Sequence, residues 1–411
     1  MMEDNSPKVI SDKIPFYRDV RFLKVFFQIL FLIGIILLAG LLYSNMLNGL
    51  SKQNLALDLS FLGSEAGFGI SEGIAYDPSE SYLKAFWVGI VNTIKVSIIG
   101  IVLATVLGFI FGIARLSSNW LIRNIATVYV ETFRNIPLLL QILFWAALTR
   151  ALPTVRNSII ISDSIVLNVR GIYFPSFEPG PGFSAWLWYL FVGVILAIIV
   201  VLVLAGFRHS GQLSEPHHTD RPSFISNIIF GAKWAAAPTF LIVAIAGLFL
   251  TSEVPFAVNR PVLQGFNYVG GMNLTPEFSA LLIGLAVYTS AFIAEVVRSG
   301  IQAVVKGQRE AARSVGLKES QVLRLVVIPQ AIPIIVPPLT SQYLNLAKNS
   351  SLATAIGFPE LLHIGHTMMN QTGQSIPIFG MVMLSYLIMS LTTSAFMNWY
   401  NHRITRIGRS R

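Results

Sequence analysis

The run Gln308-Arg309-Glu310-Ala311-Ala312-Arg313-Ser314-Val315-Gly316 is a polar, basic island between two strongly apolar segments. The three- and four-residue spacing of its alanines and Val315 predicts a short helix with small residues on one side. Gly316 suits the position just past that helix, where a positive φ is needed. A second helix, at about 319–328, is expected to end at Pro329. The stretch predicts a helix–glycine–helix elbow that another surface can approach closely. A plain basic loop between membrane segments is the alternative.

The composition of the chain places it in a membrane. Of its 411 residues, 54% are hydrophobic and 12% are charged, whereas soluble domains carry roughly 25% charged residues. A water-soluble globule of this size cannot bury so much apolar surface, so the chain belongs in a bilayer. The net charge of +9 comes from cations that flank apolar segments, which is the ordinary topological signal and no sign of nucleic-acid binding. The absence of cysteine excludes disulfides, thiol catalysis and cysteine-based metal sites.

Eight apolar segments have lengths that suit membrane-spanning helices. We therefore predict an all-α polytopic membrane protein with about eight transmembrane helices. The first segment is too long for a typical signal-peptide core and is interpreted as a retained anchor. The segments lie at about 25–43, 85–114, 121–147, 185–207, 234–250, 278–297, 331–356 and 376–399.

The distribution of lysine and arginine predicts the orientation. Eight crossings put both termini on one side of the membrane. The N-terminal segment 1–24, the elbow and the basic tail 401–411 all fall on the side that carries most of the cations. Because basic loops stay in the cytoplasm, both termini and the elbow are expected to be cytoplasmic.

Two acid–base pairs lie in or near the predicted membrane segments. Glu131 and Arg134 are three residues apart, so we expect them to pair with each other just before a proline that should kink the helix. Glu295 and Arg298 form a similar pair next to the elbow, and structural roles are expected for both pairs. Lys95 is expected to extend to the headgroups at the far membrane surface.

Lys348 lies deep in the seventh segment, among polar side chains. Three prolines precede it, so this helix is expected to be broken or bent. Interrupted helices near the membrane midplane expose polar groups to the substrates of transporters. A cation beside amides and hydroxyls can hold a carboxylate, although a plain interhelical hydrogen-bond cluster fits as well. The candidates for a substrate path are Lys348, Asn345, Asn349 and Ser350.

The elbow resembles the coupling motif of permease subunits in ATP-binding-cassette (ABC) importers. That motif has Glu-Ala-Ala, a glycine and an Ile-x-Leu-Pro run, and here it reads Glu310-Ala311-Ala312, Gly316 and Val326-x-Ile328-Pro329. The resemblance implies a type I ABC importer transmembrane domain with a cytoplasmic coupling helix. It also implies that the elbow sits in a groove on a separate ATPase subunit and transmits the closure of that subunit into the membrane.

Other runs resemble the polar amino acid branch of these importers, the histidine/glutamate/glutamine permease group. They lie at 92–96, 131–141, 288–298 and 348–352, so the resemblance covers about 85–400, as an ABC transmembrane type-1 domain. The chain departs from five-span members of that group by an extra N-terminal helix and loop at 25–84 and by inserted helices at about 151–276. This layout resembles the Q-type permease subunit of the general L-amino acid importers of Gram-negative bacteria.

The resemblance implies a subunit for amino-acid transport in the bacterial cell inner membrane, and not an enzyme. The chain has no Gly-x-x-x-x-Gly-Lys-Ser/Thr phosphate loop, so no cofactor is expected in it, and ATP and Mg are expected on a separate cytoplasmic ABC ATPase. The other expected partners are a second, related permease subunit in a heterodimer, a periplasmic amino acid-binding protein and membrane lipid.

Two other function classes fit the sequence less well. An ion-driven secondary transporter of small polar solutes is the main alternative, but it typically carries acidic residues at the membrane midplane. The middle of the predicted segments lacks a convincing unpaired carboxylate. A membrane enzyme is disfavoured because no His-x-x-x-His cluster with a carboxylate occurs. His363 and His366 lack a third ligand, so no metal site is assigned.

Overall fold

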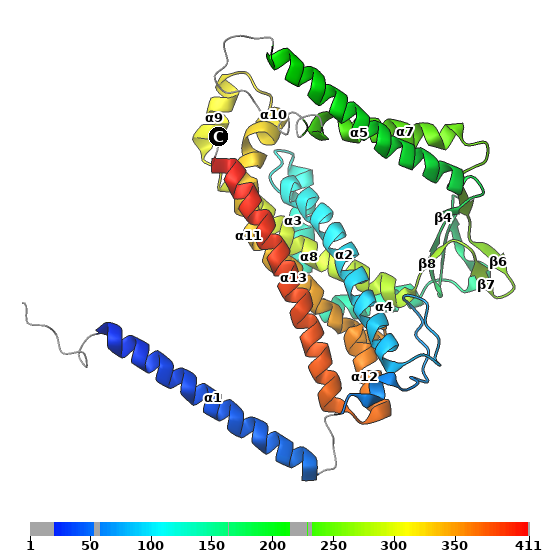
Figure 1. Ribbon diagram of the computed structural model, residues 1–411, viewed down its shortest axis with the longest axis vertical. Coiled ribbons are helices and arrows are strands. Elements are labelled where there is room, and N and C mark those ends of the chain that lie inside the picture. Colours follow the sequence, from blue (N-terminus) through cyan, green and yellow to red (C-terminus); the bar gives the residue numbers. More distant parts are fainter. Residues whose placement is uncertain (1–19, 53–57, 163, 214–227, 229–231, 410–411) are drawn as a thin grey trace, which may run out of the picture.

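The computed structural model describes residues 20–52, 58–162, 164–213, 228 and 232–409, and this part of the chain is mainly helical (Figure 1). The predicted helical class is confirmed, whereas the predicted segment 1–24 lies outside the described residues except for 20–24. The main helices are α1 (Val20–Lys52), α2 (Tyr82–Ala114), α3 (Trp120–Asn135), α4 (Leu138–Arg150), α5 (Phe183–Leu213), α7 (Ala237–Leu250), α8 (Pro276–Gln302), α9 (Lys306–Ser314), α10 (Glu319–Gln321), α11 (Ile328–Asn349), α12 (Leu361–Thr372) and α13 (Ser375–Arg409).

All eight predicted membrane segments are helical. Six described helices are long and apolar enough to cross a bilayer, α3 and α4 together form a bent pair, and the segment Trp234–Leu250 is a shorter apolar helix. None of the residues in the most apolar part of α1 is buried, and this helix lies apart from the others in Figure 1.

The third predicted segment is not one kinked helix. The axes of α3 and α4 differ by 106°, so the chain turns sharply between them. Ile136 is extended, with φ −94° and ψ 128°, because the ring of Pro137 disfavours the helical conformation of the residue before it. Leu138 and Ile142 of α4 then pack in the main core against α8.

Helices α2 and α8 form the centre of the bundle. A stripe of small residues on α2 lets the two parallel helices approach closely. A Cβ added to Gly108 would lie 2.4 Å from the side chain of Ile293, and one added to Gly112 would lie 2.8 Å from the backbone oxygen of Ala294. Small residues at this spacing are the common means of close helix packing in membranes.

Helix α2 is longer than a bilayer requires. Its 33 residues correspond to about 50 Å, against a hydrocarbon thickness of about 30 Å. The part before Lys95, about 20 Å long, extends past the start of α8 and packs with residues 60–81 and α12 in a second apolar cluster. We call this assembly the α12 head; it lies at the opposite end of the bundle from α9 (Figure 1).

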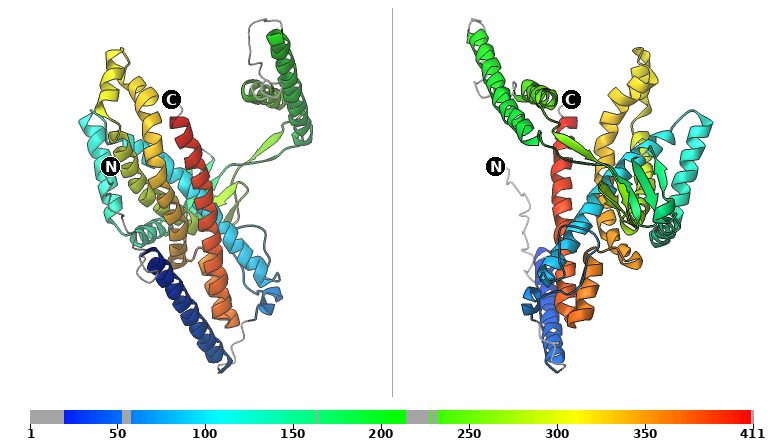
Figure 2. Two further views of the ribbon diagram at one scale, coloured as in Figure 1. Left: turned by 60° about the vertical axis from the view of Figure 1, so that its left-hand side comes forward. Right: turned by 90° about the vertical axis from the view of Figure 1, so that its right-hand side faces the viewer.

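The inserted region contains β-structure that the sequence did not reveal. Four antiparallel strands form a sheet in the order β1-β2-β3-β8, and two ribbons pair β4 with β5 and β6 with β7. The helical hairpin α5–α7 rises from the β4–β5 ribbon and stands apart from the bundle (Figures 1 and 2). The strands are β1 (Ile159–Ile161), β2 (Ile165–Asn168), β3 (Gly171–Phe174), β4 (Ser176–Pro179), β5 (Phe256–Asn259), β6 (Val262–Gln264), β7 (Asn267–Val269) and β8 (Met272–Leu274).

Candidate functional site

The elbow predicted from the sequence is present at the α9 end of the bundle. After α9 the N–H of Leu317 donates to the carbonyl of Ala312 over 3.3 Å, and the N–H of Gly316 donates to the carbonyl of Arg313 over 2.9 Å. These two bonds close a Schellman turn, whose left-handed residue is Gly316 with φ +85°. The prediction for the glycine is confirmed.

The second half of the elbow differs from its prediction. The helix does not end at Pro329. Instead, α10 leads into a π-helical segment, η5 (Val322–Val327), and then directly into α11, with Pro329 in the first turn. A proline is tolerated in a first turn, where its missing N–H would have had no partner, and the wide turns before it make room for the ring. The elbow therefore continues rigidly into a membrane helix.

The small residues of α9 do not share one side. Ala312 is 6% exposed and packs in the main core with Val304 and Val322, whereas Ala311 is exposed and Val315 is 76% exposed. One alanine thus fixes α9 to the bundle, and the other is free for an incoming surface. The prediction of a single face of small residues is wrong, since adjacent residues on a helix point about 100° apart.

A direct contact ties α9 to the end of α8. The guanidinium of Arg309 donates to the backbone oxygen of Ile301 over 2.6 Å. At the outer edge of the elbow, Arg313 makes two hydrogen bonds to the carboxylate of Glu319, of 2.6 and 3.1 Å. The carboxylate of Glu310 makes no hydrogen bond or ion pair with any residue that the structure describes, and its side chain is exposed. A displacement of α9 would therefore pull on α8.

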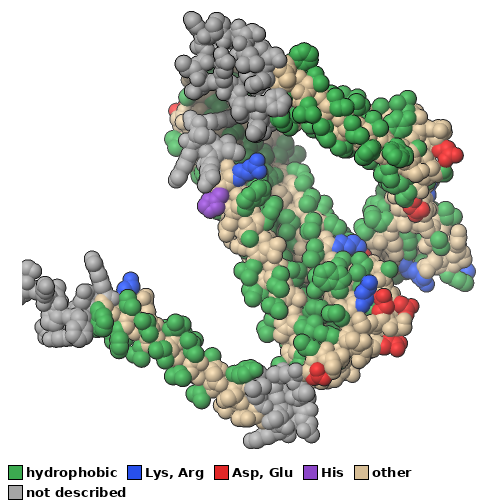
Figure 3. Space-filling model, in the orientation of Figure 1, with side chains coloured by type: hydrophobic (Ala, Val, Ile, Leu, Met, Phe, Trp, Pro, Cys, Tyr) green, Lys and Arg blue, Asp and Glu red, His purple; other side chains and the backbone are tan. Residues whose placement is uncertain are grey.

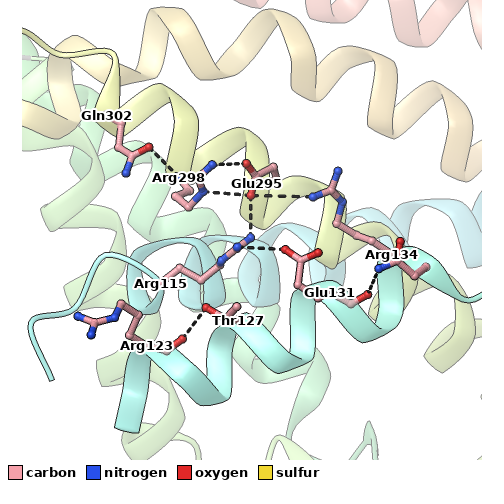
Figure 4. Close-up of polar contacts among 9 residues, drawn as sticks. Arg115, Arg123, Thr127, Glu131, Arg134, Glu295, Arg298 and Gln302 are labelled. Atoms are coloured by element: carbon pink, nitrogen blue, oxygen red, sulfur yellow. Dashed lines mark hydrogen bonds and ion pairs between the residues drawn. The ribbon is translucent and has the colours of Figure 1, made fainter. Parts of the chain in front are cut away.

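A network of charged side chains joins α2, α3 and α8 near the same end (Figure 4). Arg115 donates to Glu295 over 2.7 Å and to Glu131 over 3.1 Å, and its side chain is only 12% exposed. Arg298 makes two hydrogen bonds to Glu295, as predicted for this pair. Arg134 lies 4.0 Å from Glu295.

The predicted Glu131–Arg134 pair is wrong. Each of these residues pairs with another helix, because the buried cation of Arg115, which follows α2, needs carboxylates and α3 supplies one. Spacing within α3 suggested a local pair, and only the tertiary structure reveals the stronger competitor. The network sits one to two turns before the end of α8, so it fixes the part of α8 next to the elbow.

The substrate-path candidates lie where α11 changes shape. The helix runs through its three internal prolines without a break and becomes a 3₁₀ helix, η6 (Ser350–Ile356), only after Asn349. The predicted break of this helix is therefore wrong: residues 319–356 form one continuous span, in which only the hydrogen-bond pattern changes, from α to 3₁₀, after Asn349. Ser350 is buried, with its hydroxyl bonded to the carbonyl of Ala347 over 2.7 Å.

An exposed polar stripe runs along α11 toward this point. Ser341, Asn345 and Lys348 follow each other at helical spacing, and all three are exposed, whereas Leu346 between them is fully buried. Lys348 pairs with no carboxylate among the described residues. Polar side chains that are unpaired at membrane depth face either water or another protein.

The prediction that Lys95 extends to the lipid headgroups is wrong, because its side chain forms an ion pair within the protein. Its ammonium lies 2.7 Å from the carboxylate of Glu72, and the ring of Phe278 lies 4.7 Å from it. Thr275 donates to the other oxygen of Glu72 over 2.8 Å.

The spacing Gly-x-Ser-x-Gly occurs around Glu72, at Gly69–Gly73. It lies in a loop and not between a strand and a helix, so it does not indicate an enzyme.

Sequence reasoning also missed Glu360. This carboxylate is fully buried and accepts from the N–H of Leu362 and of His363 at the start of α12, over 2.9 and 2.8 Å. Thr354 and Tyr386 donate to it as well, over 3.1 and 2.7 Å. An acidic residue just before an apolar run is an N-cap signal that the sequence did carry. Glu360 thereby links η6, α12 and α13.

Comparisons with known proteins place these features in context. A family model described as "Binding-protein-dependent transport system inner membrane component" matches residues 222–406. The chain is 44% identical over 390 residues to YhdX of Escherichia coli (strain K12), which is named as an amino-acid ABC transporter permease protein; the match covers 93% of this chain and 94% of that protein. It is 42% identical over 399 residues to AapQ of Rhizobium johnstonii, named as a general L-amino acid transport system permease protein, with 95% and 94% covered. A solved structure described as an amino acid ABC transporter with histidines aligns at 21% identity with a TM-score of 0.45, covering 78% of this chain and 95% of that one.

Proposed function

This chain belongs to the family of amino-acid ABC transporter permeases, and we propose that a separate cytoplasmic ATPase drives it through the elbow around α9. As a member of this family it is a multi-pass inner-membrane transport subunit with a type I ABC transporter transmembrane domain. ATP and Mg would be bound by the ATPase, because this chain has no phosphate loop.

The observation that carries the proposal is the construction of the elbow. Its free face offers Ala311 and Glu310 to a partner, while Ala312 and Arg309 hold the other side to the bundle. Such an element can receive a displacement and pass it to α8 and α11, which it joins. The excess of basic residues in the segments predicted on that side supports a cytoplasmic position for both termini and for the α9 end.

The test changes the free face and leaves the bundle contacts intact. Glu310→Lys should abolish ATP-driven uptake into proteoliposomes while the protein still inserts and purifies as a monodisperse species. Ala311→Trp should act the same way by steric exclusion of the ATPase, and Ala311→Ser is the matched control with normal uptake. Uptake that persists in Glu310→Lys and Ala311→Trp would exclude coupling at this surface.

We place the substrate path along the polar stripe of α11. Lys348 would meet the carboxylate of an L-amino acid, and Asn345, Asn349 and Ser350 would line or support that point. The stripe is exposed in the single chain, which supports an opposite wall contributed by a second, related permease subunit in a heterodimer. A periplasmic amino acid-binding protein would deliver substrate at the α12 end.

A variant of Lys348 tests the path separately from the coupling. Lys348→Ala should lower uptake at least about tenfold, equivalent to about 1.4 kcal/mol, with assembly and basal ATP hydrolysis retained, because the elbow is unchanged. Lys348→Arg should retain more uptake, since it keeps the charge. Lys84, a half-buried lysine at the start of α2, provides the control as Lys84→Ala. Normal transport kinetics in Lys348→Ala would reject the substrate-path role.

A further inference from the structure

The β-strands of the inserted region form a module at one level of the membrane. Four helix ends meet it through short connections, and those of α5, α7 and α8 are the ends that lie away from α9 (Figure 1). The ends are Arg150 of α4, Phe183 of α5, Leu250 of α7 and Pro276 of α8. The connections to the nearest strands or turn are about one to five residues long, so the module cannot rise far above the membrane boundary at about 3.3 Å per residue.

This module exposes large apolar side chains. In β1 the three isoleucines are all exposed, with Ile160 at 56%. Among the described strands β1 pairs only with β2, at the edge of the sheet. The β6–β7 hairpin exposes Phe266 at 72%. A soluble protein rarely leaves such a group of side chains, or such an edge, open to water. The members of this outer patch are Ile159, Ile160, Ile161, Val262, Leu263, Phe266 and Val269.

Arginines connect and border the outer patch. The guanidinium of Arg156, just before β1, lies 5.1 Å from the centre of the Phe266 ring. Arg170 donates to Asn267 of β7, and the rings of Tyr173 and Tyr268 lie 5.5 Å apart. The β1 edge and the β6–β7 hairpin are therefore parts of one surface that combines aliphatic, aromatic and cationic groups.

We propose that the outer patch rests on the phospholipid leaflet on the α12 side of the membrane. Its apolar side chains would enter the boundary between headgroups and acyl chains. Arg156 and Arg260, which is exposed two residues before β6, would meet lipid phosphates. The hydrophobic surface of the hairpin α5–α7 continues onto the module (Figure 3), so lipid that surrounds the hairpin also reaches the patch. The β-module then anchors the hairpin at a fixed depth. This inference does not depend on the solute or on the coupling role of the elbow.

The absence of cysteine makes a direct test possible, because a single introduced cysteine carries the only spin label. Phe266→Cys and Ile160→Cys are compared with Ile198→Cys, on the exposed face of α5, and with Ala75→Cys, on the exposed loop of the α12 head. The full chain is reconstituted in phosphatidylethanolamine–phosphatidylglycerol vesicles, and relaxation by oxygen is compared with relaxation by a water-soluble nickel chelate.

For labels at positions 266 and 160, the ratio of relaxation by oxygen to relaxation by the chelate should be several-fold higher than for the label at position 75. It should be lower than for the label at position 198. Arg156→Gln should move the Phe266 label toward the Ala75 value. Chelate accessibility equal to that of Ala75 would place the patch in water and overturn the proposal. Exclusion of both reagents, with an immobilised spectrum, would show a protein partner on the patch and overturn it as well.

Discussion

The α2–α8 pair is held by a polar network at each end, and the two networks are built differently. Near α9, Arg115, Glu295 and Arg298 lie on or next to the two helices themselves, and α3 adds Glu131. Near α12, Lys95 of α2 is paired with Glu72, which comes from a loop before α2. The network near α9 is therefore built by helices of the bundle itself, whereas the network near α12 depends on the added N-terminal region.

The spacing of the networks matches the bilayer. Lys95 and Arg115 are 20 positions apart, or about 30 Å along a helix, which is the thickness of the hydrocarbon core. Charged groups are costly inside that core and inexpensive at its borders. The two networks are thus spaced to lie at the two borders, and the close contact of α2 with α8 through small residues lies between them.

Disrupting the close contact of α2 with α8, which lies between the two networks, should have the largest effect on stability. In Gly112→Val the added atoms would collide with the backbone oxygen of Ala294, which cannot move without α8. We expect a loss of at least about 3 kcal/mol, seen as little folded protein in size-exclusion chromatography. Gly380→Val is the control, because no atom lies within 4 Å of a Cβ at that position of α13. Equal yields of the two variants would contradict the close packing.

At the α9 end, Glu295→Gln should destabilise the protein by about 2 kcal/mol, because it leaves the buried Arg115 with one carboxylate. That estimate is reduced for the partial exposure of Glu295, which is 27%. Glu131→Gln should cost less than about 1 kcal/mol, since Glu131 is 51% exposed. Thermal unfolding in detergent measures both. A larger loss of stability in Glu131→Gln than in Glu295→Gln would contradict the central position of Glu295 in the network.

At the α12 end, the pair of Glu72 and Lys95 should show a coupling of about 1 kcal/mol in a double-mutant cycle. Glu72→Gln and Lys95→Met each break the pair and leave one partner unmatched, whereas the double variant removes both charges. The double variant should therefore unfold at a higher temperature than the sum of the single effects predicts. Additive effects would show that the ion pair contributes nothing and that the loop is held only by its apolar contacts.

The sequence predicted the elements of this fold more reliably than their contacts. Apolar length located helices at all eight predicted segments, of which six, or seven with the bent pair α3–α4, are long and apolar enough to cross a bilayer. The position of Gly316 predicted the turn after α9. Both predictions depend on local properties of the chain. Pro329 misled because a proline that ends a helix and one that begins the next differ only in the conformation of the residues before it. The strands of the inserted region were missed because three- and four-residue strands carry too little periodicity.

The charged residues show the same limit. Glu295 and Arg298 were paired correctly, since neighbours on one helix turn are close whatever the tertiary structure. Glu131 and Lys95 were assigned wrongly because their partners, Arg115 and Glu72, are 16 and 23 positions away and nothing in the spacing selects them. For the candidate site, the motif identified Glu310, which is exposed, but it did not predict that Ala312 faces the bundle.

The overhang of α2 has an electrostatic consequence. The α12 head stands about 20 Å beyond the start of α8, and in physiological salt an electric field decays over about 8 Å. A soluble protein that docks on the tip is separated from the charge of the lipid headgroups by more than two such lengths. The association of such a protein should then depend on the acidic side chains of the head and hardly on the content of anionic lipid. The α12 head thus keeps a negatively charged docking protein beyond the range of electrostatic repulsion by the membrane.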